Sequence, residues 1–178
     1  MKLKVAIVFL VLGAGFVYLV FKGGYIFSGK PSADVQNVQS SGDLIRQLAS
    51  AKLRDYEGQE LRLSEKQLTE PEALIVHLWA SWCAPCVNEV PELVEYSKHN
   101  PQVLFVIVSL DEDGADIAKF MKSFPEFNSD QYIKIWDKDN QLAKLFEADR
   151  LPMSVVIRKK QQSPQIIKSV VDWKNFQI

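Results

Sequence analysis

The feature that most constrains this chain is the segment Cys83-Ala84-Pro85-Cys86, which holds both of its cysteines. A nearly continuous apolar run, 73–80, precedes the segment, as expected for a strand that is buried on both faces. Apolar residues at helical spacing follow, so the segment is predicted to join a strand to the start of a helix. The unpaired N–H groups at a helix start favour a thiolate there. A thiolate beside a second thiol is the minimum requirement for disulfide exchange.

The chain from residue 43 onward alternates predicted strands and helices. A weak amphipathic turn and a hairpin come first. The elements expected after them are a strand at 73–80, a helix from 84 in which Pro91 makes a kink, a strand at 103–110, a helix at 115–124, a strand at 132–136, a helix at 140–147 capped by Asp139, and strands at 154–158 and 165–171. This order predicts an α/β fold whose central, mainly parallel sheet has helices on both faces and an antiparallel pair at its edge. Active residues of such sheets gather at the carboxyl ends of strands, where Cys83 lies.

The first residues, 1–27, are predicted to be an N-terminal transmembrane helix that anchors the chain. Lys2 and Lys4 precede an uncharged run, 5–21, which as a helix nearly spans the roughly 30 Å hydrocarbon core. Lysines before the run predict that the N-terminus stays inside, so the rest is exported to the periplasmic side of the inner membrane. A cleaved secretory signal is the alternative interpretation.

Composition and spacing restrict the function classes of the remaining chain. Residues 28–42 are small and polar and are predicted to be a flexible linker, whereas 43–178 are expected to form one domain. The net charge of −1 gives no basic surplus for nucleic acid. A four-ligand zinc site would need His77 and His99 in addition to the two cysteines, and the spacing of these four residues fits no common zinc finger. We therefore expect no metal and no cofactor other than the cysteine pair itself.

Several motifs, taken together, resemble the thioredoxin fold. They are the sequence Trp-Ala-Ser-Trp-Cys-Ala-Pro-Cys at 79–86 after a buried strand, Pro91 within the following helix, and Leu151-Pro152 before a later strand. The resemblance implies that Pro152 follows a cis peptide bond and sits against the disulfide. It also implies that the backbone of Leu151 pairs with an extended substrate.

A narrower resemblance is to the TlpA/ResA-type membrane-anchored thioredoxin-like proteins, and it covers about residues 45–173. The predicted anchor, the sequence at 86–91 and an extra helix and strand at about 112–136 carry it. The chain runs only a few residues past Trp173, so the C-terminal helix of the fold is expected to be short or missing.

The same resemblance assigns roles around the cysteines. It implies that Cys83 is the attacking cysteine, with a lowered thiol pKa, and that Cys86 is the more buried resolving cysteine. Glu89 matches the helix glutamate of the family, and it either exchanges a proton with a thiol or is a first-turn acid that favours the helix dipole. His77 stands where plain thioredoxins carry a buried aspartate and this family often has asparagine. His77 either relays a proton to or from Cys86 or is a satisfied core histidine.

The tryptophans of the motif are expected to differ in position. Trp79 is predicted to pack in the core, and Trp82 at the rim of the site, where it either only packs or also contacts a partner protein.

The family implies an extracytoplasmic thiol–disulfide oxidoreductase that reduces protein disulfides. Its implied clients are the haem-site cysteines of apocytochrome c or the copper-site cysteines of an oxidase under assembly. Its implied electron donor is a transmembrane thiol carrier. Two alternatives stay open: an oxidase of the same fold that donates disulfides, and a binding or chaperone-like module whose thiols are incidental.

Overall fold

The computed structural model describes residues 39–178, which form one compact unit. The predicted anchor and most of the predicted linker lie outside these residues. Within 39–178, no helix is both long enough and apolar enough to span a bilayer. Helix α2, Ser41–Ser50, comes first. It begins before Asp43, where the domain was expected to start, because Ser40 Oγ caps it by accepting the N–H of Asp43 at 3.2 Å.

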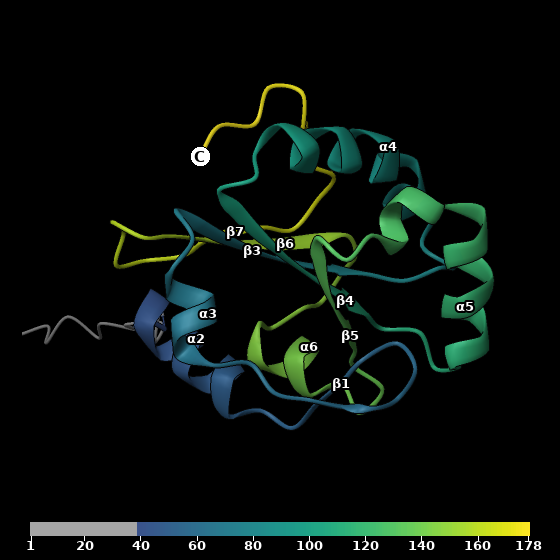
Figure 1. Ribbon diagram of the computed structural model, residues 1–178, viewed down its shortest axis with the longest axis horizontal. Coiled ribbons are helices and arrows are strands. Elements are labelled where there is room, and N and C mark those ends of the chain that lie inside the picture. The colour runs from purple at the N-terminus through teal and green to yellow at the C-terminus, as the bar shows by residue number, and fades with distance from the viewer. Residues whose placement is uncertain (1–38) are drawn as a thin grey trace, which may run out of the picture. The chain divides into compact units, whose positions relative to one another are not determined.

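A five-stranded sheet runs through the middle of the domain in the order β5–β4–β3–β6–β7 (Figure 1). Its strands are β3 (Ala73–Trp79), β4 (Val103–Ser109), β5 (Tyr132–Trp136), β6 (Met153–Arg158) and β7 (Gln165–Ile167). The first three are parallel, and β6 and β7 pair antiparallel. The predicted mixed sheet is confirmed, and the strand that leads into the cysteines is its centre. The predicted hairpin is also present, as β1 (Leu53–Arg54) paired with β2 (Glu60–Leu61).

Helices cover both faces of this sheet (Figure 1). Helices α4 (Ala84–His99) and α5 (Gly114–Ser123), the 3₁₀ helix Pro125–Asn128 and the C-terminal segment pack on one face. Helices α2, α3 (Glu65–Thr69) and α6 (Gln141–Leu145) pack on the other. The side chains of β3 alternate between the two layers, since Ile75 and Trp79 join the first core and Val76 and Leu78 the second. His77 therefore points toward α4.

Helix α6 differs from its prediction at both ends. Its cap comes from Asp137 rather than Asp139, because the Asp137 carboxylate accepts the N–H groups of Leu142 at 3.1 Å and Ala143 at 2.8 Å. The helix stops at Leu145, before the expected Glu147, whose backbone is left-handed with φ 52°. The identification of Asp139 as the cap was therefore wrong.

The last strand is shorter than the predicted 165–171. It ends at Ile167, and the N–H of Val171 donates to Glu89 of α4 instead of to a neighbouring strand. Residues 168–178 form turns and irregular segments without a helix, in line with the expectation from the sequence. Trp173 is buried among them, against Tyr96 and Phe105, and so fixes the segment to the first core.

The core beneath β3 contains a hydrogen-bonded pair of aromatic residues. Trp79 donates its indole N–H to Tyr56 Oη at 3.0 Å, and the Tyr56 hydroxyl donates to the carbonyl of Ile107 at 3.3 Å. Burial is the largest cause that raises the pKa of Tyr56 far above its ordinary value. The folded protein thus holds the phenol proton more tightly than the unfolded chain.

We expect the free energy of unfolding to fall as the pH rises above about 10, where an unfolded tyrosine ionises. The folded state keeps the Tyr56 proton, so each further pH unit costs about 1.4 kcal/mol of stability. Denaturant unfolding at several alkaline pH values checks this, with Tyr56→Phe as the comparison. The variant loses its hydrogen bonds at neutral pH but should have a shallower alkaline slope, and an unchanged slope would contradict the assignment.

Candidate active site

Cys83 and Cys86 lie at the carboxyl end of β3, where α4 begins, as predicted. Cys83 is the N-cap residue of α4, and its Sγ accepts the N–H of Cys86 at 3.3 Å. A disulfide joins the two residues. Cys83 is 5% exposed and Cys86 is 0% exposed, so an incoming sulfur atom meets Cys83 first.

The loop between β3 and α4 is held by Asp111, which the sequence analysis did not single out. Ser81 donates its backbone N–H at 3.1 Å and its hydroxyl at 2.6 Å to the Asp111 carboxylate. The Ser109 hydroxyl donates to the same carboxylate at 2.7 Å, and Trp136 Nε1 donates to the Asp111 carbonyl at 2.7 Å. The sequence did contain a clue to Asp111, because it directly follows a predicted strand that is parallel to β3. The carboxyl ends of both strands therefore lie at the same edge of the sheet.

The expected rim residues lie at the same end of the sheet. Trp82 is 68% exposed, which confirms its predicted surface position. The Leu151–Pro152 peptide bond is cis, as the resemblance implied. Met153 pairs with Leu78 in the register of β6 and β3, so Pro152 lies beside the carboxyl end of β3. The roles of Trp82, Leu151 and Pro152 toward a substrate stay predictions.

A set of buried polar groups connects β3, α4 and β6 behind the cysteines. His77 Nε2 lies 3.0 Å from Glu89 Oε1, and His77 Nδ1 lies 3.0 Å from Ser154 Oγ. Glu89 Oε2 accepts the N–H of Val171 at 3.2 Å. His77 is 1% exposed and Glu89 is 3% exposed, so both side chains depend on these partners rather than on water. The sequence pointed to His77 and Glu89 separately but not to their contact.

This arrangement bears on the interpretations of Glu89, His77 and His99 that the sequence left open. Glu89 is not a first-turn acid, since the first turn of α4 contains none and Glu89 lies a turn further along. His77 has a partner at each ring nitrogen, as a satisfied core histidine should, and it also faces α4. His99 lies at the opposite end of α4, with an exposed side chain, so the four residues considered for zinc are not brought together. Within 39–178, no cluster of three or more metal-ligating side chains occurs.

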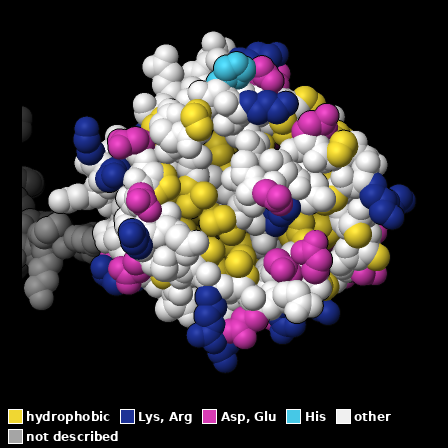
Figure 2. Space-filling model, in the orientation of Figure 1, with side chains coloured by type: hydrophobic (Ala, Val, Ile, Leu, Met, Phe, Trp, Pro, Cys, Tyr) yellow, Lys and Arg dark blue, Asp and Glu magenta, His cyan; other side chains and the backbone are white. Residues whose placement is uncertain are grey.

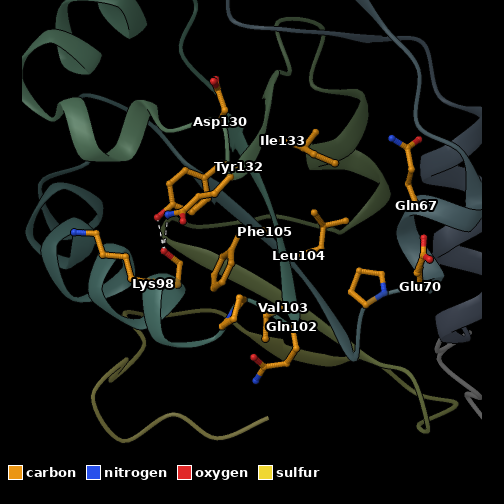
Figure 3. A pocket seen from close by; sticks show the side chains of 14 residues that line it. Gln67, Glu70, Lys98, Gln102, Val103, Leu104, Phe105, Asp130, Tyr132 and Ile133 are labelled. Atoms are coloured by element: carbon orange, nitrogen blue, oxygen red, sulfur yellow. Dashed lines mark hydrogen bonds between the residues drawn. The ribbon is translucent and has the colours of Figure 1, made fainter.

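A cavity of about 650 Å³ opens at the opposite end of the sheet (Figure 3). The first residues of β4 and β5, including Val103 and Tyr132, line it together with residues before β3 and at the end of α4. Its buried hydroxyls are paired, since Ser97 Oγ and Tyr132 Oη lie 2.5 Å apart. On the face in Figure 2, charged side chains of both signs surround patches of hydrophobic side chains. The residues that line the cavity do not include the cysteines.

Comparison with known proteins supports the fold and the motif. A family model described as thioredoxin-like matches residues 71–163. The thiol-disulfide oxidoreductase ResA of Bacillus thuringiensis subsp. konkukian is 30% identical over 115 residues, which cover 64% of this chain and 63% of that protein. ResA of Bacillus subtilis is 24% identical over 117 residues, which cover 65% of this chain and 62% of that one. The chain thus matches less than two thirds of the length of these relatives.

Solved structures with low sequence identity share the fold. StoA from Bacillus subtilis superposes with a TM-score of 0.55 at 19% identity, covering 70% of this chain and 90% of StoA. A secreted Mycobacterium tuberculosis disulfide oxidoreductase homologous to E. coli DsbE gives a TM-score of 0.60 at 17% identity, covering 72% and 92% of the two chains. At these identities the likeness concerns the arrangement of helices and strands alone.

Proposed function

The chain belongs to the thioredoxin-like family, and on that premise we propose that it is a thiol–disulfide oxidoreductase that acts on proteins. The observation that carries the proposal is the Cys83–Cys86 disulfide at the start of α4, with one sulfur slightly exposed and the other fully buried. A sulfur at a helix start is stabilised as a thiolate by the helix dipole and by nearby N–H groups. The N–H of Cys86, which points at Cys83 Sγ, is one such group.

The reaction follows from the order in which the sulfurs are reached. In the reduced protein the Cys83 thiolate attacks a client disulfide, a bond forms between Cys83 and one client sulfur, and the other client sulfur leaves as a thiolate. Cys86 then loses its proton and attacks Cys83 Sγ, which releases the second client sulfur as a thiolate. The client gains two electrons, and the protein ends with the Cys83–Cys86 disulfide. A dithiol donor must reduce it again for another cycle.

Glu89 is proposed as the proton acceptor for Cys86. The two residues are three apart on α4, which brings their side chains to the same face of the helix. Both are buried, so Glu89 is a carboxylate that is shielded from bulk water on the helix face that carries Cys86. A positioned base of this kind typically accelerates a proton transfer by about 10²–10⁴-fold.

The proposed direction is reduction of protein disulfides outside the cytoplasm. The basic start and the apolar run at 5–21 support an anchored, exported domain, and the resemblance to the TlpA/ResA-type proteins supports a reductant. The proposed clients are apocytochrome c or copper-site cysteines, with a transmembrane thiol carrier as donor. Because surroundings outside the cytoplasm are oxidising, a reductant there depends on such a dedicated donor.

The reduction potential tests the direction of electron flow. We expect a value closer to the about −270 mV of thioredoxin than to the about −120 mV of a strong periplasmic oxidant. The purified chain is equilibrated in glutathione or dithiothreitol buffers of known potential. The fraction of free thiols, measured by alkylation and mass spectrometry, then gives its reduction potential. A potential near that of the oxidants would favour the disulfide-donating alternative, while the exchange chemistry itself would stand.

A further inference from the structure

We propose that His77 is a positioning residue that holds the Glu89 carboxylate ready to accept the proton of Cys86. The inference rests on the proposed function, since it concerns the step in which Cys86 resolves the mixed disulfide. His77 belongs to β3 and Glu89 to α4, so their contact joins the central strand to the helix that carries the cysteines.

One hydrogen bond and one close contact with a ring nitrogen explain how Glu89 is held. A buried carboxylate is stable as an anion only when donors face its oxygens. The N–H of Val171 supplies one donor to Oε2, and His77 Nε2 lies at the other oxygen. His77 can donate there only when the ring proton is on Nε2. The Ser154 hydroxyl lies 3.0 Å from Nδ1, and in that tautomer it is the hydroxyl that donates to Nδ1.

The surroundings of His77 leave Glu89 as its ionisable partner. In the strand register, the neighbour of His77 on β4 is Ile107 and its neighbour on β6 is Ser154. From the C-terminal segment, the ring of Trp173 stands edge-on to the imidazole, with 6.1 Å between ring centroids. Among these described contacts, only Glu89 carries a carboxylate. Tyr96 of α4 also packs against Trp173, at 5.4 Å between ring centroids, so the groups around the pair include one phenol and no second carboxylate.

The proton balance of the resolving step gives this pair its role. When Cys86 attacks Cys83 Sγ, the new S–S bond forms, the client sulfur leaves with the electron pair, and the Cys86 proton passes to the Glu89 carboxylate. Without the imidazole, the 3.0 Å contact between His77 Nε2 and Glu89 Oε1 is lost, and the N–H of Val171 alone holds the carboxylate in place for this proton. The attack by Cys83 on the client does not use that proton and should be independent of His77.

The test separates these two steps in the full chain. Reduced protein is mixed with one equivalent of Ellman's reagent in a stopped-flow instrument, where the first thionitrobenzoate release reports attack by Cys83 and the second reports resolution by Cys86. We expect His77→Leu and Glu89→Gln each to slow the second release by roughly 100-fold and to leave the first within about twofold. His77→Gln places an N–H at the same number of bonds from Cα as Nε2, and should keep the second release within about threefold.

Combining variants distinguishes a positioning role from general damage. If His77 acts through Glu89, His77→Leu should slow the second release no further in the Glu89→Gln background. If His77→Leu fails to fold, Ser154→Ala takes its place. We expect Ser154→Ala to slow the second release several-fold in the wild-type chain and not to slow it further in the Glu89→Gln background. His99→Gln, which alters the other histidine of the chain at an exposed site, is the matched control and should change neither release.

Three results would overturn the inference: an unchanged second release in His77→Leu, equal slowing of both releases, or a full additional loss in the double variant. A wild-type Cys83 that reacts no faster than a free thiol would instead overturn the proposed function, and this inference with it.

Discussion

Cys83→Ser is expected to abolish the reduction of protein disulfides, by roughly 10³-fold or more relative to the wild-type chain. The Cys83 sulfur caps α4 and is the less buried of the pair, so it is the atom that a client disulfide reaches. A serine hydroxyl at this position cannot form a bond to the client sulfur. Turnover of insulin disulfides with dithiothreitol as donor measures the effect.

The Cys86 variant is the matched control for this experiment. Cys86→Ala retains the attacking sulfur, so its first attack should proceed at a rate near that of the wild type while multiple turnover stops at the mixed disulfide. Substantial turnover by Cys83→Ser would favour the binding or chaperone-like alternative, in which the thiols are incidental.

Trp79→Ala is expected to lower the free energy of unfolding by about 3–5 kcal/mol. The indole is buried between Phe120, at 4.5 Å between ring centroids, and Phe127, at 5.3 Å. Its removal leaves a cavity at the end of β3 and also takes the N–H donor away from Tyr56 Oη. Trp79→Phe should lower the free energy of unfolding by less than Trp79→Ala does, because most of the apolar contact remains. Urea unfolding followed by far-ultraviolet circular dichroism gives both values.

Trp82 provides the comparison within the same motif. Its side chain is 68% exposed, so Trp82→Ala should change the free energy of unfolding by no more than about 0.5 kcal/mol. A loss in Trp82→Ala as large as that in Trp79→Ala would contradict the assignment of one tryptophan to the core and the other to the surface.

The sequence was sufficient for features that depend on local pattern. The apolar run at 73–80 and the helical spacing after Cys83 predicted β3 and α4, and the resemblance added the cis bond before Pro152. These succeed because the continuous apolar run has the length of a strand, whereas the apolar residues after Cys83 recur at helical spacing over a longer segment.

The errors arose where a group other than the one expected from the sequence made the hydrogen bond. Asp139 has the sequence position of a cap, yet the carboxylate of Asp137 reaches the free N–H groups of α6. The strand expected to extend to Val171 stops early because the N–H of Val171 bonds to Glu89, far away in the sequence. The contacts of His77 with Glu89 and Ser154 likewise depend on how α4 and β6 pack against β3, which no local pattern records.

Asp111 shows an intermediate case. Its position after a predicted parallel strand placed it at the edge that carries the cysteines, but its four hydrogen bonds from Ser81 and Ser109 became visible only in the structure. A carboxylate at the end of a strand is common in sequences, so position alone did not distinguish it from a solvated side chain.

The central claim, that Cys83 exchanges disulfides with client proteins, is tested most directly by isolating the mixed disulfide. The Cys86→Ala full chain is expressed in its own cells, free thiols are blocked with an alkylating agent, and the attached proteins are identified by mass spectrometry of the linked peptides. We predict that non-reducing gels show species in which Cys83 is joined by a disulfide to cysteines of a small set of client proteins. These species should disappear in the double variant Cys83→Ser/Cys86→Ala. Recovery of Cys86→Ala with its Cys83 unlinked to any protein would contradict the claim.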